Sequence, residues 1–123
     1  GREFTVGIVD GEVLPAVEIV TSEGWYDYTA KYEVDTTRYV VPAELEAEKV
    51  AEMQALALKT FDALDCRGFG RVDFRMTPEG ELFVLELNTI PGFTTHSLLP
   101  KAAAAAGIDF PSLCDRIIRT ASL

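Results

Sequence analysis

The sequence has little cysteine, a single histidine and no long apolar run. Its two cysteines, Cys66 and Cys114, are too few for a disulfide framework and lack the spacing of a metal-binding motif. No apolar run approaches the roughly 20 residues of a membrane-spanning helix, and the amino terminus lacks the pattern of a secretory signal. We therefore expect a cytoplasmic protein that has no disulfides and does not bind a membrane.

Positive charge is also scarce, which excludes one class of partner. The 11 Lys and Arg residues are outnumbered by 20 Asp and Glu residues, so the formal net charge is −9. A nucleic-acid-binding domain needs a basic face, and we therefore expect no nucleic acid partner. The acidic balance is compatible with a nucleotide held through magnesium, because Mg²⁺ prefers oxygen ligands such as carboxylates.

Two alternating apolar runs flank Asp10-Gly11, and this pattern is a strong hairpin signal. A two-residue turn at this point places Glu3 opposite Glu18, which is a mildly unfavourable pair of like charges. Pro15 in the second run indicates an edge position. The side chains expected on the core face of this hairpin are Phe4, Val6, Ile8, Val13, Val17 and Ile19.

The remaining patterns predict one long loop and three helices. Residues 22–42 have no clear period, and their aromatic stretch at 25–32 is either a functional loop or aromatic padding over a sheet edge. Helices are expected from Pro42 to about residue 65, at 98–106 and at 110–121. The apolar side chains that repeat at helical spacing in the first of these are Leu45, Val50, Met53, Ala57, Phe61 and Leu64. Together with the hairpins, they predict an α+β domain with a mostly antiparallel sheet flanked by helices.

A second hairpin gathers the polar residues of greatest chemical interest. Two runs at 71–76 and 82–88 flank a turn at Glu79-Gly80, and the resulting register pairs Asp73 with Glu86 and Arg71 with Asn88. These four side chains then share one face of the hairpin, because side chains alternate along a strand. The opposite face is expected to be entirely apolar, with Val72, Phe74, Met76, Phe83, Leu85 and Leu87.

The polar face combines hard oxygen ligands with a guanidinium group. Asp73, Glu86 and Asn88 offer the oxygens that Mg²⁺ takes, and Arg71 offers a planar donor fork suited to phosphate. Such a set favours phosphoryl transfer, in which positioning and charge neutralisation do most of the catalysis. An ordinary network of surface ion pairs remains open as an alternative. An acid–base carboxylate pair for glycoside hydrolysis is less favoured, because it leaves two of the four residues without a role.

The segment after this hairpin resembles a site for an anion. Pro91-Gly92 allows the backbone to approach a ligand closely, and Thr94-Thr95-His96-Ser97 leads into a helix with a sequence suited to capping. The N–H groups at the start of that helix favour a carboxylate or an oxyanion. A plain turn followed by a helix cap is the alternative. We expect the lone His96 to be structural.

Four sequence blocks follow one another in a characteristic order and spacing. They are Glu3-Phe4-Thr5-Val6, Tyr26-Asp27-Tyr28 with Ala30-Lys31-Tyr32, Gly68-Phe69-Gly70-Arg71-Val72-Asp73, and Glu86-Leu87-Asn88-Thr89-Ile90-Pro91-Gly92-Phe93-Thr94-Thr95-His96-Ser97-Leu98-Leu99-Pro100. Across essentially the whole chain they resemble the C-terminal part of the D-alanine–D-alanine ligase family, which belongs to the ATP-grasp superfamily. The last two blocks are highly specific together, although the Glu-x-Asn element alone is shared with other ATP-grasp enzymes.

The resemblance implies an ATP-grasp C-terminal domain over residues 1–123 and the ligation of two D-alanines to D-alanyl-D-alanine for peptidoglycan synthesis. ATP would phosphorylate the carboxylate of the first D-alanine, and the amine of the second would attack the acyl phosphate. The resemblance assigns two Mg²⁺ ions, for which Mn²⁺ can substitute, to Asp73, Glu86 and Asn88. It places Arg71 on the transferred phosphate and Lys31 on the ATP phosphates, with Glu86 contributing to the nucleotide site through the metal.

The resemblance also implies roles around the second substrate. Gly92 would donate its backbone N–H to the tetrahedral centre, and Ser97 and Leu98 would hold the carboxylate of the second D-alanine. Glu3 and Tyr32 would take part in a hydrogen-bond network beneath a closing loop. Tyr32 and Leu98 together point to D-alanine as the second substrate, because relatives that use D-lactate or D-serine differ at these positions.

The family also has an N-terminal substrate domain and a central ATP-binding lobe, and neither is found in this sequence. The chain begins at Gly1 in what resembles the middle of a longer protein, so we expect a fragment that is inactive alone. The complete enzyme is expected to be a homodimer. Two alternatives are a fragment of another ATP-grasp carboxylate–amine ligase and a non-catalytic binding module. The retention of all three metal-ligand positions counts against the second.

Overall fold

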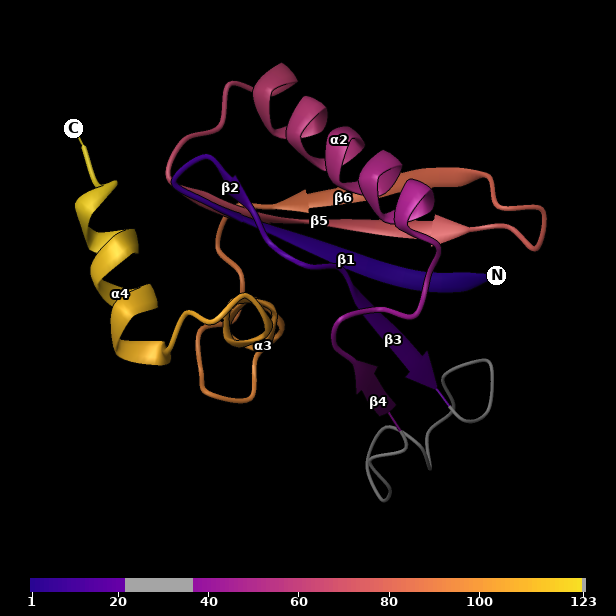
Figure 1. The fold of residues 1–123 in the computed structure, drawn as a ribbon. Helices are drawn as coiled ribbons and strands as arrows, with labels where there is room; N and C mark the ends of the chain where they lie inside the picture. Colours follow the sequence, from indigo (N-terminus) through magenta and orange to yellow (C-terminus); the bar gives the residue numbers. More distant parts are fainter. Residues whose placement is uncertain (22–36, 123) are drawn as a thin grey trace, which may run out of the picture.

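The computed structural model describes residues 1–21 and 37–122, in which an antiparallel sheet has helices on both faces (Figure 1). The strand order is β4-β3-β1-β5-β6, and β2 pairs with β1 beside this path. The expected α+β class with a mostly antiparallel sheet is therefore confirmed. The elements are β1 (Arg2–Val9), β2 (Glu12–Val13), β3 (Val17–Thr21), β4 (Thr37–Val40), α2 (Ala47–Ala63), β5 (Phe69–Met76), β6 (Leu82–Asn88), α3 (Leu98–Ala105) and α4 (Phe110–Arg119).

The two faces of the sheet carry two separate apolar cores. Alternation along β1 sends Phe4, Val6 and Ile8 toward α2, where they pack with side chains of that helix and of β5. The opposite face carries Val9 and Val17, which pack beneath α3 and α4. In Figure 1, α3 lies on the other side of the sheet from α2, and α4 lies beyond the end of the sheet. The second core covers only part of its face, so the rest of that face is left for polar residues.

Gly7 allows α3 to lie close against β1. A Cβ at this position would lie 2.5 Å from Cδ1 of Leu99 and 3.2 Å from Cδ1 of Leu14. Leu99 and Leu14 are both fully buried in the second core. The absent side chain at Gly7 therefore sets the distance between the sheet and the helix that begins at the candidate substrate site.

The register of the first hairpin is partly as predicted and partly wrong. The turn at Asp10-Gly11 and the pairing next to it are confirmed. Beyond it the register shifts by one residue, so that Phe4 rather than Glu3 lies opposite Glu18. The shift occurs between β2 and β3, where Pro15 lies outside both strands. Val17 and Ile19 therefore face away from α2, and their assignment to the first core is wrong.

The shift replaces a predicted repulsion with an ion pair. Arg2 donates from Nε and Nη2 to the two carboxylate oxygens of Glu18, each at 2.8 Å. The guanidinium carbon of Arg2 also lies 5.0 Å from the centre of the Phe4 ring. The pKa of Glu18 is lowered because of the hydrogen bonds and the positive charge of Arg2, although partial burial opposes this effect.

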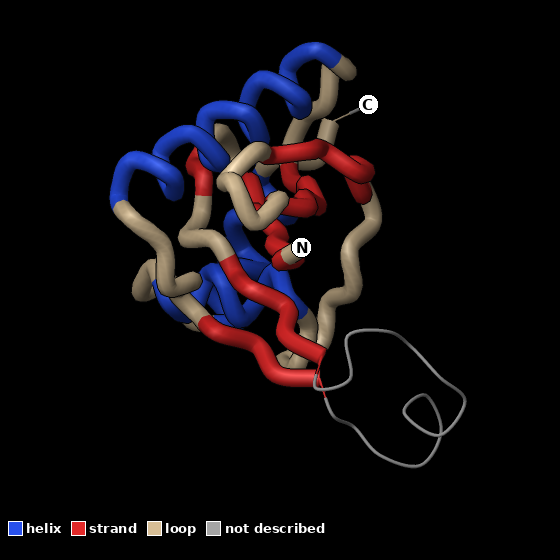
Figure 2. The backbone as a smooth tube through the Cα atoms, turned by 90° about the vertical axis from the view of Figure 1, so that its right-hand side faces the viewer, coloured by secondary structure: helices blue, strands red, loops and turns tan. Residues whose placement is uncertain are grey.

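Residues 22–42 are not a single loop, because the last part of this range forms β4. This strand pairs with β3, and the sequence pattern did not reveal it because four residues are too few to show a period. Figure 2 shows the β3–β4 pair extending to one side of the sheet. The aromatic stretch at 25–32 lies outside the described residues.

The predicted helices are confirmed with shorter bounds, and one predicted core residue in the first is wrong. In α2, the side chains of Met53, Ala57 and Phe61 are buried. Leu64 lies just after the helix and is 61% exposed. Lys49 of α2 donates from Nζ to the carbonyl oxygen of Gly80 at 2.7 Å, which ties the helix to the β5–β6 turn.

The second hairpin has the predicted pairs at the site but a different register near its turn. Arg71 pairs with Asn88 and Asp73 pairs with Glu86, as predicted. Nearer the turn Met76 pairs with Leu82, and the register shifts between Asp73 and Phe74. The extra residue on β6 is a bulge at this point.

The bulge moves two side chains out of the predicted core. Phe83 lies opposite Arg75 and is 49% exposed, and Leu85 is 53% exposed. The predicted apolar face is therefore wrong at Phe83 and Leu85. Val72, Phe74 and Met76 are buried in the first core as predicted.

We expect Met53→Ala to lower the free energy of unfolding by about 2–5 kcal/mol, because it leaves a cavity between α2 and the sheet. Leu64→Ala is the matched control and should change it by less than about 0.5 kcal/mol, because most of this side chain is exposed. Urea denaturation measures both values. Equal losses for the two variants would contradict the core described above.

Acidification should remove the stabilisation contributed by the Arg2–Glu18 pair. Glu18 has a lowered pKa in the folded state, so its contribution is present above its ordinary value of 4.5 and disappears as the pH falls through the lowered value. The pair is partly exposed and should contribute no more than about 1 kcal/mol. Glu18→Gln should lower stability at pH 7 and flatten its dependence on pH below 4.5. An unchanged acid profile would exclude this contribution.

Candidate functional site

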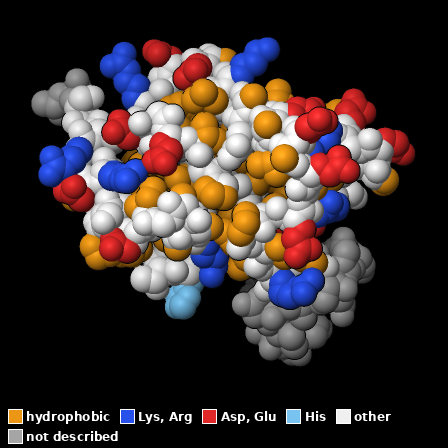
Figure 3. Space-filling model, viewed as in Figure 1, with side chains coloured by type: hydrophobic (Ala, Val, Ile, Leu, Met, Phe, Trp, Pro, Cys, Tyr) orange, Lys and Arg blue, Asp and Glu red, His pale blue; other side chains and the backbone are white. Residues whose placement is uncertain are grey.

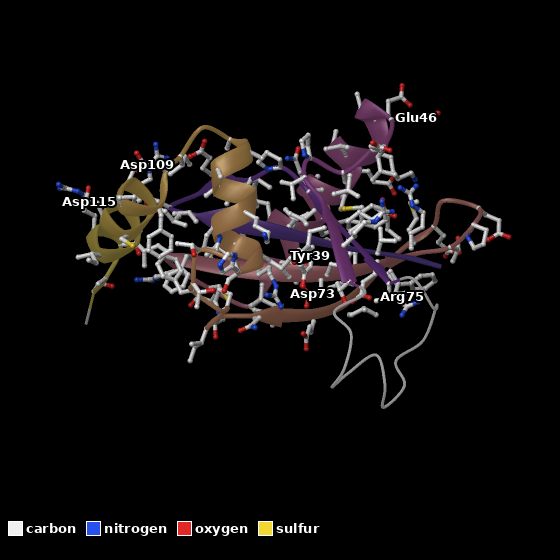
Figure 4. The ribbon with its side chains drawn as sticks, turned by 90° about the horizontal axis from the view of Figure 1, so that it is seen from below. Tyr39, Glu46, Asp73, Arg75, Asp109 and Asp115 are labelled. Atoms are coloured by element: carbon white, nitrogen blue, oxygen red, sulfur yellow. The ribbon has the colours of Figure 1, made fainter. Side chains whose placement is uncertain are left out.

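The site lies on the face of the sheet opposite α2. Cross-strand pairs share a face, so Arg71, Asp73, Glu86 and Asn88 lie together, as predicted. Figure 4 shows Asp73 on this face with Arg75 of β5 and Tyr39 of β4 nearby. The pairing of β1 with β5 adds three residues of β1 to the same surface. Glu3 lies opposite Arg75, Thr5 lies opposite Asp73, and Gly7 lies opposite Arg71.

Asp73 is the most constrained carboxylate of the site. Arg71 donates from Nε to its Oδ1 at 3.0 Å and from Nη2 to its Oδ2 at 3.3 Å. Thr5 donates from its hydroxyl to Oδ1 at 2.6 Å. The side chains of Arg71 and Asp73 are only 16% and 13% exposed, so they are largely shielded from water. Such charge-assisted hydrogen bonds hold the carboxylate in one orientation.

Glu86 lies close enough to Asp73 for the two carboxyl groups to interact. The pKa of Glu86 is raised, first because of a hydrogen bond with the carboxyl of Asp73 and second because of its negative charge. The positive charge of Arg71 opposes the rise. The raised pKa means that two negative charges at this point repel each other. A cation bound between the two carboxyl groups would relieve that repulsion.

Asn88 supplies an amide oxygen at the end of the same strand. Its Oδ1 accepts a hydrogen bond from the backbone N–H of Ile90 at 2.9 Å, which fixes the orientation of the amide. A carbonyl oxygen has a second lone pair, which can bind a cation. Asp73, Glu86 and Asn88 therefore fit Mg²⁺, which usually combines one or two carboxylates with substrate phosphate and water.

The protein ligands alone would not complete a coordination shell. Within residues 1–21 and 37–122, no group of three or more His, Cys, Asp and Glu side chains could hold a metal ion. The remaining positions would have to be filled by ligands from outside these side chains, such as phosphate oxygens. Asp73 engages the Nε–H and one Nη2–H of Arg71, so the Nη1 hydrogens can bind a phosphate.

The loop after β6 brings Gly92 next to Ser97. A Cβ on Gly92 would lie 3.1 Å from Oγ of Ser97. That hydroxyl accepts from the N–H of Thr94 at 3.0 Å and lies 2.9 Å from Thr94 Oγ1. Ser97 is the N-cap residue of α3, but its side chain makes no capping hydrogen bond, although the composition of residues 94–97 is suited to capping. Leu98 opens α3, where backbone N–H groups have no acceptor within the helix.

Glu3 lies two residues along β1 from Thr5, at the opposite end of the site from Asn88. It pairs with Arg75 on one side and with Ile19 on the other. It also lines a shallow cavity of about 170 Å³ between β1 and β3, near the point where the described part of β3 ends. Lys31 and Tyr32, which the sequence predicted at the site, lie outside the described residues.

Some side chains on this surface were missed from the sequence. Thr5 belongs to a conspicuous block but was given no role, because its partner Asp73 is far away in the sequence and the pairing of β1 with β5 was not predicted. Phe83 and Leu85 were placed in the core, although they lie exposed beside Glu86. The only available signal for Thr5 was its place in an alternating run, on the same side as Glu3.

Charges of both signs are mixed on one face of the molecule. On the face seen in Figure 3, Lys and Arg side chains are dispersed among Asp and Glu side chains. Cys66 and Cys114 are both free thiols and half-buried. No helix within residues 1–21 and 37–122 is long and apolar enough to cross a membrane.

Comparison with known proteins matches these residues to one family. The profile of the family described as "D-ala D-ala ligase C-terminus" matches residues 1–119. A D-alanine–D-alanine ligase from Saccharophagus degradans is 48% identical over 118 residues, which are 96% of this chain and 38% of the relative. A ligase of the same name from Chromohalobacter salexigens is 47% identical over 120 residues, with 98% of this chain and 38% of the relative covered.

Solved structures agree with the family match. A Bacillus anthracis D-alanine–D-alanine ligase complexed with ATP has a TM-score of 0.82 and 37% identity, covering 98% of this chain and 38% of that structure. The Enterococcus faecalis VanG D-Ala:D-Ser ligase has a TM-score of 0.83 and 37% identity, covering 98% of this chain and 36% of that structure. The expected ATP-grasp C-terminal fold is thus confirmed.

The chain spans less than two fifths of the length of these relatives. Within that part, sequence and fold agree over nearly every residue. The chain therefore belongs to the family of D-alanine–D-alanine ligase C-terminal domains.

Proposed function

We propose that residues 1–123 form the metal- and phosphate-binding part of an ATP-dependent D-alanine–D-alanine ligase. The observation that carries this proposal is the meeting of the Asp73 and Glu86 carboxyl groups beside the guanidinium of Arg71. The names of the relatives support it, as does the ATP complex of the Bacillus anthracis structure. The product would be D-alanyl-D-alanine for peptidoglycan, made in the cytoplasm.

Asp73, Glu86 and Asn88 would hold two Mg²⁺ ions, with Mn²⁺ as a substitute. The ions would supply charge neutralisation at the phosphates of ATP. Arg71 would bind the transferred phosphate through the guanidinium hydrogens that Asp73 does not engage. Because Asp73 already orients the guanidinium, Arg71 would need little reorganisation when phosphate binds.

The loop after β6 and the start of α3 would hold the reacting carboxyl groups. The N–H of Gly92 would stabilise the oxyanion of the tetrahedral centre, and Gly92 has no side chain to obstruct that approach. Ser97 and the N–H of Leu98 would bind the carboxylate of the second D-alanine, which the positive end of the α3 dipole favours. Glu3, Lys31 and Tyr32 would complete the site beside a closing loop.

D-Alanine is the proposed second substrate on the basis of Leu98 and Tyr32. Overall fold does not separate the candidates, because a D-Ala:D-Ser ligase is as similar in structure as the D-alanine–D-alanine ligases. Residues upstream of this domain in the complete enzyme would supply the rest of the ATP site and the site of the first D-alanine. We propose a homodimer for that complete enzyme.

We expect Glu86→Gln in the complete ligase to lower D-alanine-dependent phosphate release from ATP by at least about 100-fold. The amide cannot supply the negative charge that the metal site needs. The free energy of unfolding should change by less than about 0.5 kcal/mol, because Glu86 is exposed and lies beside a like charge. Phosphate release and urea denaturation are the two measurements.

Glu79→Gln is the matched control, since it makes the same chemical change at an exposed position in the turn of the same hairpin. Near-wild-type turnover by Glu86→Gln would exclude the metal assignment. Phosphate release that depends on another amino acid would favour a different ATP-grasp ligase. A complete chain that releases no phosphate with any amino acid would favour the non-catalytic alternative.

Gly92→Ala should raise the KM for the second D-alanine by about 10-fold, because its Cβ would displace the Ser97 hydroxyl that lies 3.1 Å away. If this contact is the cause, the double variant Gly92→Ala with Ser97→Ala should be no worse than Ser97→Ala alone. Steady-state kinetics at saturating ATP provide the comparison. Fully additive losses would show that Gly92 acts independently of Ser97.

A further inference from the structure

Thr5 is the single polar residue that is buried among the residues the structure describes. It is 1% exposed and lies between Phe4 and Val6 in β1. In the sheet it is opposite Asp73 of β5 on one side and Val17 of β3 on the other. A buried hydroxyl is tolerated where it has a hydrogen-bond partner, and the partner of Thr5 is a carboxylate of the proposed metal site.

The hydroxyl of Thr5 has two acceptors within reach but only one proton. Asp73 Oδ1 lies at 2.6 Å, whereas the carbonyl oxygen of Val72 lies at 3.3 Å. The shorter contact to a charged acceptor is the stronger one. Thr5 therefore donates to Asp73. The donor is in β1 and the acceptor is in β5, which is paired with β1.

The two oxygens of Asp73 are not equally occupied. Oδ1 accepts from the hydroxyl of Thr5 and from Nε of Arg71, which engages both of its lone pairs. Of the hydrogen bonds that Thr5 and Arg71 donate to Asp73, Oδ2 accepts only the one from Nη2 of Arg71, at the longer distance of 3.3 Å. The lone pair that remains on Oδ2 is the one that Asp73 can offer to a cation.

We infer that Thr5 is a positioning residue that reserves Oδ2 of Asp73 for the divalent cation. This inference rests on the proposed function, because it needs Asp73 to be a metal ligand. Arg71 alone fixes the carboxylate less completely, because two hydrogen bonds from one planar group leave the carboxylate free to twist out of the guanidinium plane. Thr5 belongs to a neighbouring strand with a buried backbone, so it holds Oδ1 from a second, rigid direction. A ligand oriented in this way binds its metal more tightly.

Two pairs of variants in the complete ligase isolate the hydroxyl from the packing of the side chain. Thr5→Val removes the hydroxyl and keeps the branched shape that suits a strand. Thr5→Ser keeps the hydroxyl and loses the methyl group, and Thr5→Ala loses both. Thr and Val differ by the hydroxyl in a branched side chain, and Ser and Ala differ by the hydroxyl in a smaller side chain. The comparison of Thr5→Ser with Thr5→Ala therefore still tests the hydroxyl if Thr5→Val does not fold.

The direct measurement is the dissociation constant of Mn²⁺, followed by electron paramagnetic resonance of the free ion. We expect Thr5→Val and Thr5→Ala to weaken Mn²⁺ binding by about 10-fold, and Thr5→Ser to stay within about threefold of wild type. The Mg²⁺ concentration that gives half-maximal phosphate release should shift by the same factors. Thermal unfolding without metal shows whether the variants remain folded.

Wild-type Mn²⁺ binding by Thr5→Val or Thr5→Ala would overturn the inference, as would equal losses for Thr5→Ser and Thr5→Ala. The variant Glu86→Gln separates this outcome from a failure of the proposed function. If the wild-type ligase binds Mn²⁺ no better than Glu86→Gln does, the metal site itself is wrong. If Glu86→Gln abolishes binding while the Thr5 variants bind normally, only the role of Thr5 is wrong.

Discussion

The antiparallel pairing of β1 with β5 is the constraint on which the rest of the structure depends. It runs without interruption from Arg2 opposite Met76 to Val9 opposite Phe69. Both strands lie inside the sheet, with β3 and β6 at their outer sides. Because this pairing has no bulge, side chains alternate regularly between the two faces of the sheet along the whole length of both strands. One face becomes the core beneath α2, and the other receives Asp73 and Arg71.

This division explains how a buried core and a polar site share the same strands. Val72 and Phe74 pack under α2, whereas Asp73 between them points to the opposite face and meets Thr5. The second core then covers only the end of that face where Gly7 lets α3 approach. The position of α3 therefore determines two things. It decides which part of the sheet stays uncovered, and it decides where the first residues of α3 lie relative to that uncovered part.

Sequence patterns predicted local features well and distant ones poorly. The turn at Asp10-Gly11, the pairing of Asp73 with Glu86 and the helices around Met53 and Leu99 depend on neighbours in the chain, and all of them are confirmed. The wrong assignments have two physical causes. A single extra residue, such as the one between β2 and β3, moves the side chains that follow it to the opposite face of the sheet. The amino-acid composition of the segment does not reveal this shift. Pairings between strands far apart in sequence leave no local trace, which concealed the contact between Thr5 and Asp73.

The candidate site itself was predicted in part because it lies mostly on one hairpin and one loop. Arg71, Asp73, Glu86 and Asn88 follow from alternation along the hairpin. The turn at Gly92 and the helix start after Ser97 follow from local signals, but the individual roles of Gly92 and Ser97 come from the resemblance to a family. Their contact depends on a loop whose path has no periodicity. Exposed Phe83 and Leu85 could not be distinguished from core residues by their chemistry.

The bulge in β6 shows that the face on which a carboxylate lies can be encoded by a length. Near the turn Phe74 pairs with Val84, and a regular continuation would place Leu85 opposite Asp73 and Glu86 opposite Val72. Glu86 would then point toward the core beneath α2. The one additional residue restores the phase of alternation before the strand reaches the site. The spacing between Gly80 and Glu86 is therefore as informative about the face on which this carboxylate lies as the residues themselves.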